Sequence, residues 1–263
     1  MIDAFKAEHG VSFLIQTSGG QVLFDTGQTG NVFLHNAHQL DIDLGKIDAL
    51  AISHAHFDHT GGLESFLQHS RPTIPFYASP DVFRERYSLH EGEYRSIGMR
   101  FARESIAPKV DFRLNADPVE IIPGVWTTGE IKDRSEFEGR SAGHVIRVDG
   151  EWQSDPYRDD LSLVLETEDG LIVICGCCHA GLLNTLKQVK AHFGRDIIAV
   201  LGGTHLGSAT DDMLAQAVNV LKNTYAVPRL FPNHCTGKRA YNALAEAFGD
   251  KVQPCRAGTI QTF

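Results

Sequence analysis

One short stretch, residues 52–62 with the sequence ISHAHFDHTGG, constrains this chain more than any other segment. It contains four potential metal ligands within six positions, which are His54, His56, Asp58 and His59. An apolar run precedes the stretch, and its Gly-Gly pair opens an apolar pattern of helical spacing. This context predicts a tight turn between a buried strand and a helix, where ligand side chains can converge.

The spacing of these ligands indicates a metal site. Alternate residues of an extended chain share a face, so His54 and His56 can hold one ion from the same side. The turn then brings Asp58 and His59 to a neighbouring position, which suggests a second ion. Imidazole nitrogens with carboxylate oxygens suit zinc, with iron or manganese as alternatives. A single histidine is more often a surface or core residue, but four ligand-type residues at this spacing favour the metal site.

The rest of the chain repeats one arrangement. Residues 11–25 and 161–175 each predict a β-hairpin, because two short β-rich runs flank a turn sequence. Segments of helical periodicity follow both hairpins. Three further histidines stand where predicted strands end, namely His179, His205 and His234. Since such strand ends gather along one rim of a sheet, the pattern predicts an αβ/βα sandwich with the site along one edge.

Together these segments resemble the metallo-β-lactamase fold superfamily. The resemblance spans nearly the full chain, and five motifs besides residues 52–62 resemble its branch of dihydropterin–ribofuranosylaminobenzene phosphate synthases. These motifs are Asp25-Thr26-Gly27, Thr128–Ile131, Gly176–Gly181, Gly202–Leu206 and His234–Gly237. The resemblance implies an α/β fold of four layers in the order αβ/βα, with a metal site at one edge of the sheets.

The resemblance also implies two ligand sets, one of three histidines and one that includes a carboxylate. The first set is His54, His56 and His179, and the second is Asp58, His59 and His234. Many members carry a bridging aspartate after the second hairpin, where this chain reads Gly176-Cys177-Cys178-His179. Either His179 replaces that bridge, or a thiolate of Cys177 or Cys178, or the Glu130 carboxylate, contributes. One or two zinc ions are therefore expected, with iron or manganese as alternatives.

Four other residues are predicted to assist the site. Asp25, at the end of the first hairpin, is expected to accept a hydrogen bond from the outer nitrogen of a metal-bound histidine; alternatively, it caps a turn. His205 is expected to hydrogen bond to developing negative charge or to protonate a leaving group. Lys238 and Arg239, at a predicted helix start, can hold a phosphate, with ordinary surface charge as the alternative.

The expected reaction follows from the predicted metals. A zinc-class ion lowers the pKa of bound water to about 7, which supplies hydroxide at neutral pH, and Asp58 can orient it. Residues 84–113 carry seven Lys or Arg against five Asp or Glu, which favours an anionic substrate or, alternatively, is a solvated face. The leading hypothesis is hydrolysis of an anionic small molecule, most of all a phosphoester. Alternatives are a pterin-synthase-type transferase that releases pyrophosphate, a lactonase or thioesterase, and a non-catalytic binding protein of the same fold.

Composition bounds the domain count and the partners. With 263 residues and 42% hydrophobic content, a single domain over residues 1–263 is expected. Within it, residues 72–143 are expected to form an irregular flap or cap-like insertion with short strands at 74–77 and 125–128.

The net charge of −9 argues against a nucleic-acid partner. No apolar run reaches the roughly 20 residues of a membrane span, so no membrane is expected. Five cysteines, an odd number, indicate a reducing cytoplasm rather than a disulfide framework. The oligomeric state stays open.

Overall fold

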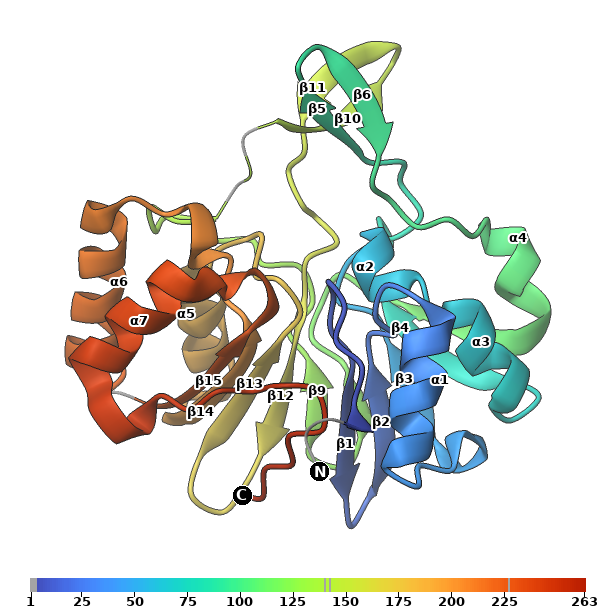
Figure 1. The fold of residues 1–263 in the computed structure, drawn as a ribbon, viewed down its shortest axis with the longest axis horizontal. Helices are drawn as coiled ribbons and strands as arrows, with labels where there is room; N and C mark the ends of the chain where they lie inside the picture. Colours follow the sequence, from blue (N-terminus) through green and yellow to red (C-terminus); the bar gives the residue numbers. More distant parts are fainter. Residues whose placement is uncertain (1–3, 140, 142, 227) are drawn as a thin grey trace. The chain divides into compact units, whose positions relative to one another are not determined.

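Two compact units make up the structure, a computed structural model that describes residues 4–139, 141, 143–226 and 228–263 (Figure 1). Unit 1 comprises residues 1–116, 121–123 and 140–159. Unit 2 comprises residues 117–120, 124–139 and 160–263. The first predicted hairpin belongs to unit 1 and the second belongs to unit 2.

The main sheet of unit 1 grows from the N-terminal hairpin. Strands β1 and β2 pair antiparallel, and β2, β3, β4 and β7 are parallel neighbours, so the order is β1-β2-β3-β4-β7. The strands are β1 Phe13–Thr17, β2 Gly20–Phe24, β3 Ala49–Ala51, β4 Ile74–Ala78 and β7 Val110–Leu114. All of β3 is buried, as expected for a central strand of a parallel sheet.

Helices α1 and α3 pack against this sheet through aromatic side chains. Helix α1 spans Gly30–Gln39, and α3 spans Leu63–His69. Phe33 of α1 and Phe66 of α3 meet edge to face with ring centroids 6.2 Å apart, in the same buried cluster as Leu50 of β3. The shorter helices of this unit are α2 Phe57–Thr60, α4 Arg103–Ile106 and the 3₁₀ turns Leu44–Lys46 and Ala107–Lys109.

A second sheet of unit 1, in the order β11-β10-β5-β6, draws two of its strands from the range that the sequence predicts as irregular. The strands are β5 Tyr87–His90, β6 Glu93–Ser96, β10 His144–Val148 and β11 Glu151–Ser154. Every residue of β6 and β11 is exposed, and Tyr94 stacks on Trp152 with ring centroids 3.9 Å apart. Exposed strands lack the apolar alternation that identifies a half-buried strand, so the sequence pattern misses them.

The sheet of unit 2 is mixed and has the order β15-β14-β13-β12-β9-β8, and residues 121–122 of β8 are counted with unit 1. Its hairpin, β12 and β13, has the predicted position, and β13, β14 and β15 are parallel neighbours. The strands are β8 Glu120–Ile122, β9 Val125–Thr127, β12 Ser162–Glu166, β13 Leu171–Cys175, β14 Ile197–Gly203 and β15 Arg229–Asn233. All of β13 is buried.

The predicted apolar faces of three helices pack on this sheet. Leu186, Leu221 and Leu244, one from each helix, lie in a buried cluster with side chains of the strands. The helices are α5 Leu182–Phe193, α6 Asp211–Asn223 and α7 Gly237–Phe248, and the 3₁₀ turns are Leu206–Ser208, His234–Thr236 and Gly249–Lys251. Helix α6 begins where the Thr210 hydroxyl accepts a hydrogen bond from the Met213 N–H. None of the helices in the described ranges has the length and apolar character needed to span a bilayer.

Three parallel strands of unit 2 end at the same edge of its sheet, and each leads into potential ligands. Cys177–His179 follow β13, His205 follows β14, and His234–Cys235 follow β15. In unit 1, β3 leads likewise into His54–His59. Within each sheet the carboxyl ends of parallel strands share one edge, so the polar side chains that follow the strands of that sheet gather there.

Candidate metal centre

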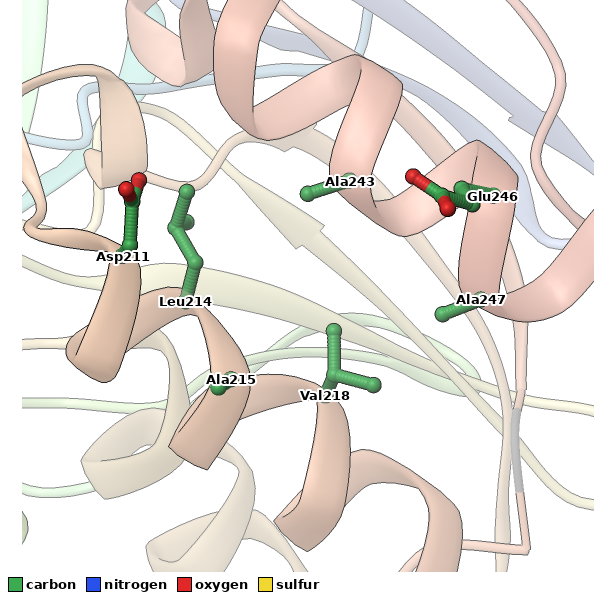
Figure 2. Close-up of a pocket in the computed structure, with 7 residues that line it drawn as sticks. All are labelled: Asp211, Leu214, Ala215, Val218, Ala243, Glu246 and Ala247. Carbon is green, nitrogen blue, oxygen red and sulfur yellow. The ribbon is translucent and has the colours of Figure 1, made fainter.

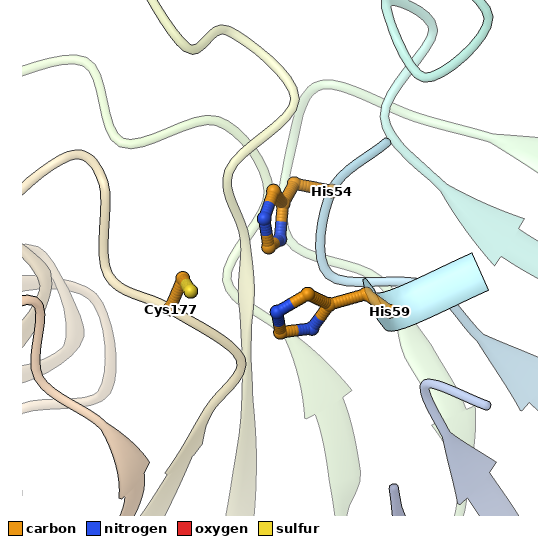
Figure 3. Close-up of side chains that lie close together, drawn as sticks. All are labelled: His54, His59 and Cys177. Atoms are coloured by element: carbon orange, nitrogen blue, oxygen red, sulfur yellow. The ribbon is translucent and has the colours of Figure 1, made fainter. Parts of the chain in front are cut away.

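The segment after β3 brings three buried histidines of unit 1 together, and Figure 3 shows two of them, His54 and His59. His54, His56 and His59 lie on the short path from β3 into α2. The His54 ring centroid is 4.5 Å from that of His56 and 4.1 Å from that of His59. Each of the three residues is at most 5% exposed. Cys177, which Figure 3 also draws, belongs to unit 2. Three predicted ligands therefore lie side by side within one unit.

The Asp25 carboxylate contacts this histidine cluster directly. Asp25 is fully buried, and its Oδ2 lies 2.6 Å from His59 Nδ1. The Ser53 N–H donates to Asp25 Oδ1 at 2.7 Å, and the Ser53 hydroxyl lies 2.7 Å from Asp25 Oδ2 and 2.9 Å from His54 Nδ1. A carboxylate at Nδ1 favours the His59 tautomer with its lone pair on Nε2, which is the form that binds a metal.

Two histidines border the Asp58 carboxylate. His9 Nε2 lies 3.4 Å and His59 Nε2 lies 3.6 Å from Asp58 Oδ2. The approach of the N-terminal segment requires Gly10, because a Cβ there would lie 2.1 Å from the Asp58 carbonyl oxygen. Sequence reasoning did not include His9 in the site, since a lone histidine near the N-terminus has no spacing signal. The structure adds it to the candidate donors of unit 1.

His144 and Tyr157 are two further neighbours that sequence reasoning missed. The His144 ring centroid lies 5.2 Å from that of His56, and His144 Nδ1 is hydrogen bonded to the Tyr157 hydroxyl. The Tyr157 ring centroid lies 6.1 Å from that of His56. Both residues are distant from the 52–62 motif in the sequence, so only the fold reveals that they line it.

Cys177, His205 and Cys235 form a group of donors in unit 2. Their ligand atoms lie within 4.8 Å of one another. The His205 N–H donates to Cys235 Sγ at 3.3 Å, and Cys235 Sγ lies 3.3 Å from the Cys177 carbonyl oxygen. His234 Nε2 lies 3.0 Å from Cys177 Sγ, and the ring centroids of His179 and His205 are 4.3 Å apart. Four predicted residues of the strand ends thus gather with Cys235, which sequence reasoning missed.

The adjacent cysteines of the Gly176–Gly181 segment have different surroundings. Cys177 contacts His234, whereas Cys178 lies in the hydrophobic cluster of unit 2 with Cys175. Hydrogen bonding to Cys175, together with burial, raises the pKa of Cys178 well above its usual range. Cys178 therefore stays a neutral thiol in the core, and Cys177 is the better candidate ligand of the two.

Cys235 and His205 influence each other's protonation. Burial alone would raise the pKa of Cys235, but hydrogen bonds with Cys177 and His205 and the His205 charge lower it to about 5. Burial also opposes a charge on His205, yet the contacts with Cys235 outweigh burial and raise the pKa of His205. A thiolate next to an imidazolium results. The same groups suit a soft or borderline cation once His205 loses its proton.

Left-handed backbone marks the turns that present these residues. The φ angles of Asp25, Cys178, His205 and His234 are 60°, 58°, 52° and 48°. A non-glycine residue in this region costs on the order of 1 kcal/mol. Such residues are retained where the surrounding structure holds them, and they cluster at functional sites. Both units therefore carry strained turns at the positions where ligands are predicted.

Three predicted residues have other contacts or positions. Arg239 forms an ion pair with Asp211, and Lys238 stands in the first turn of α7. The carbonyl oxygen of Glu130 accepts a hydrogen bond from Gln188 Nε2 at 2.9 Å. Within the described part of unit 2, Glu130 is not a member of the donor group of Cys177, His205 and Cys235. The roles suggested for Lys238, Arg239 and Glu130 stay predictions.

A hollow between α6 and α7 has a different character (Figure 2). Small and branched apolar side chains make up most of its lining, which consists of Asp211, Leu214, Ala215, Val218, Ala243, Glu246 and Ala247. None of these seven residues is a histidine or a cysteine. The hollow is therefore no part of the candidate metal centre.

Comparisons with known proteins agree with the site's composition. A family model described as the metallo-beta-lactamase superfamily matches residues 6–177, which include the whole histidine segment of unit 1. A 7,8-dihydropterin-6-methyl-4-(beta-D-ribofuranosyl)-aminobenzene-5'-phosphate synthase of Methanocaldococcus jannaschii is 32% identical, over 98% of this chain and 91% of the relative.

Two solved structures are similar over nearly the whole chain. Tm1679, described as a metal-dependent hydrolase of the beta-lactamase superfamily, has a TM-score of 0.84 and 29% identity, and the match covers 99% of this chain and 94% of that one. The metallo-beta-lactamase fold protein YhfI from Bacillus subtilis has a TM-score of 0.60 and 12% identity, with 97% and 93% covered. At 12% identity the likeness concerns the fold alone.

Proposed function

Since this chain belongs to the metallo-β-lactamase superfamily, we propose that it is a metal-dependent hydrolase of anionic small molecules, with phosphoesters as its substrate class. The superfamily match over residues 6–177 supports a hydrolase-type fold with divalent metals. The similarity to Tm1679, described as a metal-dependent hydrolase, supports the same reaction type. The prediction of an anionic substrate comes from the cations of residues 84–113 other than Arg86, which is buried against three carboxylates.

The donor chemistry of each unit fits a zinc-class ion. Unit 1 offers buried imidazoles beside the Asp58 carboxylate, and Asp25 orients one of them through its Nδ1. Unit 2 offers imidazoles and the Cys177 sulfur. The proposed ligands of a first ion are His54, His56 and His179, and those of a second are Asp58, His59 and His234. This pairing follows the resemblance described for the sequence; the family model matches residues 6–177, so it includes His54, His56, Asp58 and His59 but neither His179 nor His234.

Four residues of the chain, besides the other proposed metal ligands, are proposed to take part in the reaction. A bound zinc-class ion lowers the pKa of a water ligand to about 7 and thereby supplies a nucleophile at neutral pH. Asp58 would orient the attacking water, because a carboxylate accepts a proton from it in a fixed direction. His205 would donate a hydrogen bond to developing negative charge or protonate the leaving group. Lys238 and Arg239, at the start of α7, would hold an anionic group of the substrate.

One observation supports this proposal most strongly. Three imidazoles and the Asp58 carboxylate, all buried, lie on one turn of unit 1, and the buried Asp25 at the end of β2 holds its Oδ2 2.6 Å from His59 Nδ1. Without a cation, so many buried titratable groups are costly to keep together. A carboxylate that fixes a histidine tautomer is the arrangement that supports metal ligands in other proteins.

The test combines metal analysis with turnover. The purified protein should contain zinc, iron or manganese in stoichiometric amount, and it should hydrolyse at least one phosphodiester in a panel that also holds lactones and thioesters. His56→Ala should lower turnover at least 100-fold and reduce the metal content, while circular dichroism shows a retained fold. His38→Ala, on the exposed side of α1, is the matched control and should behave as the wild type.

Two results would contradict the proposal. If the purified protein contains no stoichiometric metal, the proposal of a metal-dependent hydrolase is wrong. Unchanged turnover in His56→Ala would separate the histidine segment from the reaction and favour a binding protein on the same fold. Hydrolysis of lactones or thioesters but not phosphodiesters would retain the metal chemistry and replace the substrate class.

A transferase is the second candidate, because the synthase of Methanocaldococcus jannaschii is 32% identical over 98% of this chain. In this reaction the site would stabilise a departing pyrophosphate while an arylamine attacks the pterin carbon. Incubation with a pterin diphosphate and an arylamine acceptor, followed by mass spectrometry, separates the two candidates. A coupled product with release of pyrophosphate supports the transferase, whereas phosphoester cleavage by water supports the hydrolase.

A further inference from the structure

We propose that Asp159 and Asp160 are positioning residues that hold the two histidine-bearing loops of the proposed metal centre, one loop each. This inference rests on the proposed function. Asp159 is the last residue of unit 1, and Asp160 is the first of its long segment in unit 2. Sequence reasoning used neither residue.

Asp159 holds the loop that carries His54 and His56. Its Oδ2 accepts a hydrogen bond at 2.8 Å from the N–H of Ala55, the residue between the two histidines. Asp159 is 1% exposed and Ala55 is fully buried. A carboxylate bound to this N–H fixes the peptide between His54 and Ala55, so it restricts the direction of His54 and the path of the chain into His56.

Arg86 in turn prevents Asp159 from moving. Its Nη2 lies 2.7 Å from Asp159 Oδ1, and its Nε lies 2.9 Å from Asp155 Oδ2. The guanidinium is completely buried and also contacts Asp81. Burial opposes the charge on Arg86, but the three carboxylates outweigh burial and raise its pKa, so it stays charged. Asp159 thus has one oxygen for the ion pair and the other for the histidine loop.

Asp160 repeats this arrangement in unit 2. Its Oδ2 accepts a hydrogen bond at 2.8 Å from the N–H of Ala180, the residue after His179. Asp160 is 2% exposed. The Gly181 backbone has a φ of 98°, so the turn between His179 and α5 has a conformation that few other residues adopt. The carboxylate therefore holds the His179 turn at the point where the chain changes direction.

The two anchors are consecutive residues, which links the ligand loops through a single peptide unit. A peptide is planar and separates adjacent Cα atoms by about 3.8 Å. Each carboxylate accepts the N–H of the residue directly after a predicted histidine ligand. The same type of contact thus occurs in both units, from adjacent positions of the chain.

The test measures metal affinity rather than turnover alone. Zinc affinity is obtained by competition with a chelator, and the absorption spectrum of the cobalt-substituted protein reports ligand geometry. Asp159→Ala and Asp160→Ala should each weaken zinc binding about 10–100-fold and change the cobalt spectrum. Asp160→Asn keeps an acceptor oxygen for the Ala180 N–H and should restore binding to near the wild-type value.

Asp81→Ala is the matched control for Asp159. Asp81 contacts the same Arg86 guanidinium, yet its other oxygen accepts a hydrogen bond from Arg84 Nε rather than from the histidine loop. This variant should lower the stability of the metal-free protein as Asp159→Ala does, while zinc affinity stays within about threefold of the wild type. If Asp159→Ala does not fold, Asp159→Asn keeps the shape but cannot accept from both Arg86 and Ala55, so it should also weaken binding.

The outcomes separate this inference from the proposed function. If Asp159→Ala and Asp160→Ala bind zinc as tightly as Asp81→Ala does, the inference is wrong. If His54→Ala and His179→Ala lose zinc in the same assay, the proposed metal centre still stands. A wild-type protein that binds no zinc, or binds it equally well after His54→Ala and His179→Ala, would overturn the proposed function and the inference with it.

Discussion

At the scale of single residues, buried carboxylates determine how this protein presents its histidines. Asp25 contacts the His59 ring, whereas Asp159 and Asp160 hold the backbone beside histidines of their own units. Each of them is at most 2% exposed. Burying a carboxylate is costly unless its oxygens are hydrogen bonded, so these contacts make the charges tolerable and restrict the ligands at the same time.

Replacing Asp25 tests the direct contact with a ligand. Asp25→Asn replaces one acceptor oxygen by a donor group, so the residue no longer supports the His59 tautomer with a carboxylate. Zinc affinity measured by chelator competition should fall about 10–100-fold. Asp43→Asn is the control, because Asp43 is an exposed cap of a 3₁₀ turn in the same unit. Equal affinities of the two variants would contradict the role of Asp25.

Glu138 makes stability depend on pH. Burial raises its pKa to about 8 from 4.5, and the hydrogen bond from the Leu183 N–H only partly offsets this. Between about pH 4.5 and pH 8 the folded protein therefore keeps the Glu138 proton, whereas the unfolded chain releases it. The contribution of Glu138 to the free energy of unfolding is fully present below about pH 4.5 and is lost as the pH rises to about 8. Between these two pH limits the free energy of unfolding changes by at most about 5 kcal/mol because of Glu138.

Urea unfolding between pH 5 and pH 9 measures this dependence. The wild type should lose stability across the range relative to Glu138→Gln, which cannot ionise. Glu168→Gln, at an exposed position of the β12–β13 turn, should follow the wild type. Parallel curves for the wild type and Glu138→Gln would show that Glu138 is ionised in the folded protein.

At the scale of elements, parallel strands of unit 2 approach each other where the ligands begin. Gly202 of β14 pairs with Cys175 of β13, and its φ is 106°. A Cβ at this position would lie 2.0 Å from the Cys175 carbonyl oxygen. The absence of a side chain thus permits the close pairing of β13 and β14 directly before the segments that carry Cys177 and His205.

Gly202→Ala should therefore disturb both strands. We expect a loss of about 2–4 kcal/mol in the free energy of unfolding, from the steric contact and the left-handed backbone together. Gly194→Ala, at the end of α5, has a φ of 65° but no atom within 4 Å of the added Cβ, and should cost only about 1 kcal/mol. Chemical denaturation compares the two, and equal losses would assign the whole effect to backbone conformation.

At the scale of the whole molecule, the predicted fold class is confirmed by the family match and by the TM-score of 0.84 to Tm1679. Each unit has its own sheet, helices and hydrophobic cluster. The proposed metal ligands are divided between the units. A ligand that binds only the folded chain stabilises it by mass action, so bound metal would raise the stability of this chain.

Removal of the metal should therefore lower the unfolding temperature. At a free zinc concentration about 100-fold above its dissociation constant, the stabilisation is about 2.7 kcal/mol, or about 5–10 °C for a chain of this size. Thermal unfolding with and without a chelator measures the shift. His54→Ala in unit 1 and His179→Ala in unit 2 should both lack it. A shift that survives in either variant would show that the altered histidine is no ligand.

The sequence predicts the regular parts of both units because their patterns are local. The hairpins at β1–β2 and β12–β13 and the apolar faces of α5, α6 and α7 all appear where periodicity and turn residues place them. The sheet of β5, β6, β10 and β11 was missed, since two of its strands are fully exposed. Hydrophobic periodicity arises because one face of an element is buried, so a strand without a buried face does not show it.

By itself, the sequence determined the chemical types of the candidate ligands and their positions at strand ends, since HxHxDH spacing and strand-to-helix turns are local features. Only the tertiary structure revealed which side chains support them. Asp159 meets Ala55 across 104 positions of the chain, and Cys177 meets His234 across 57. Contacts between such distant residues depend on how strands and loops pack, and this packing cannot be read from local patterns in a single sequence.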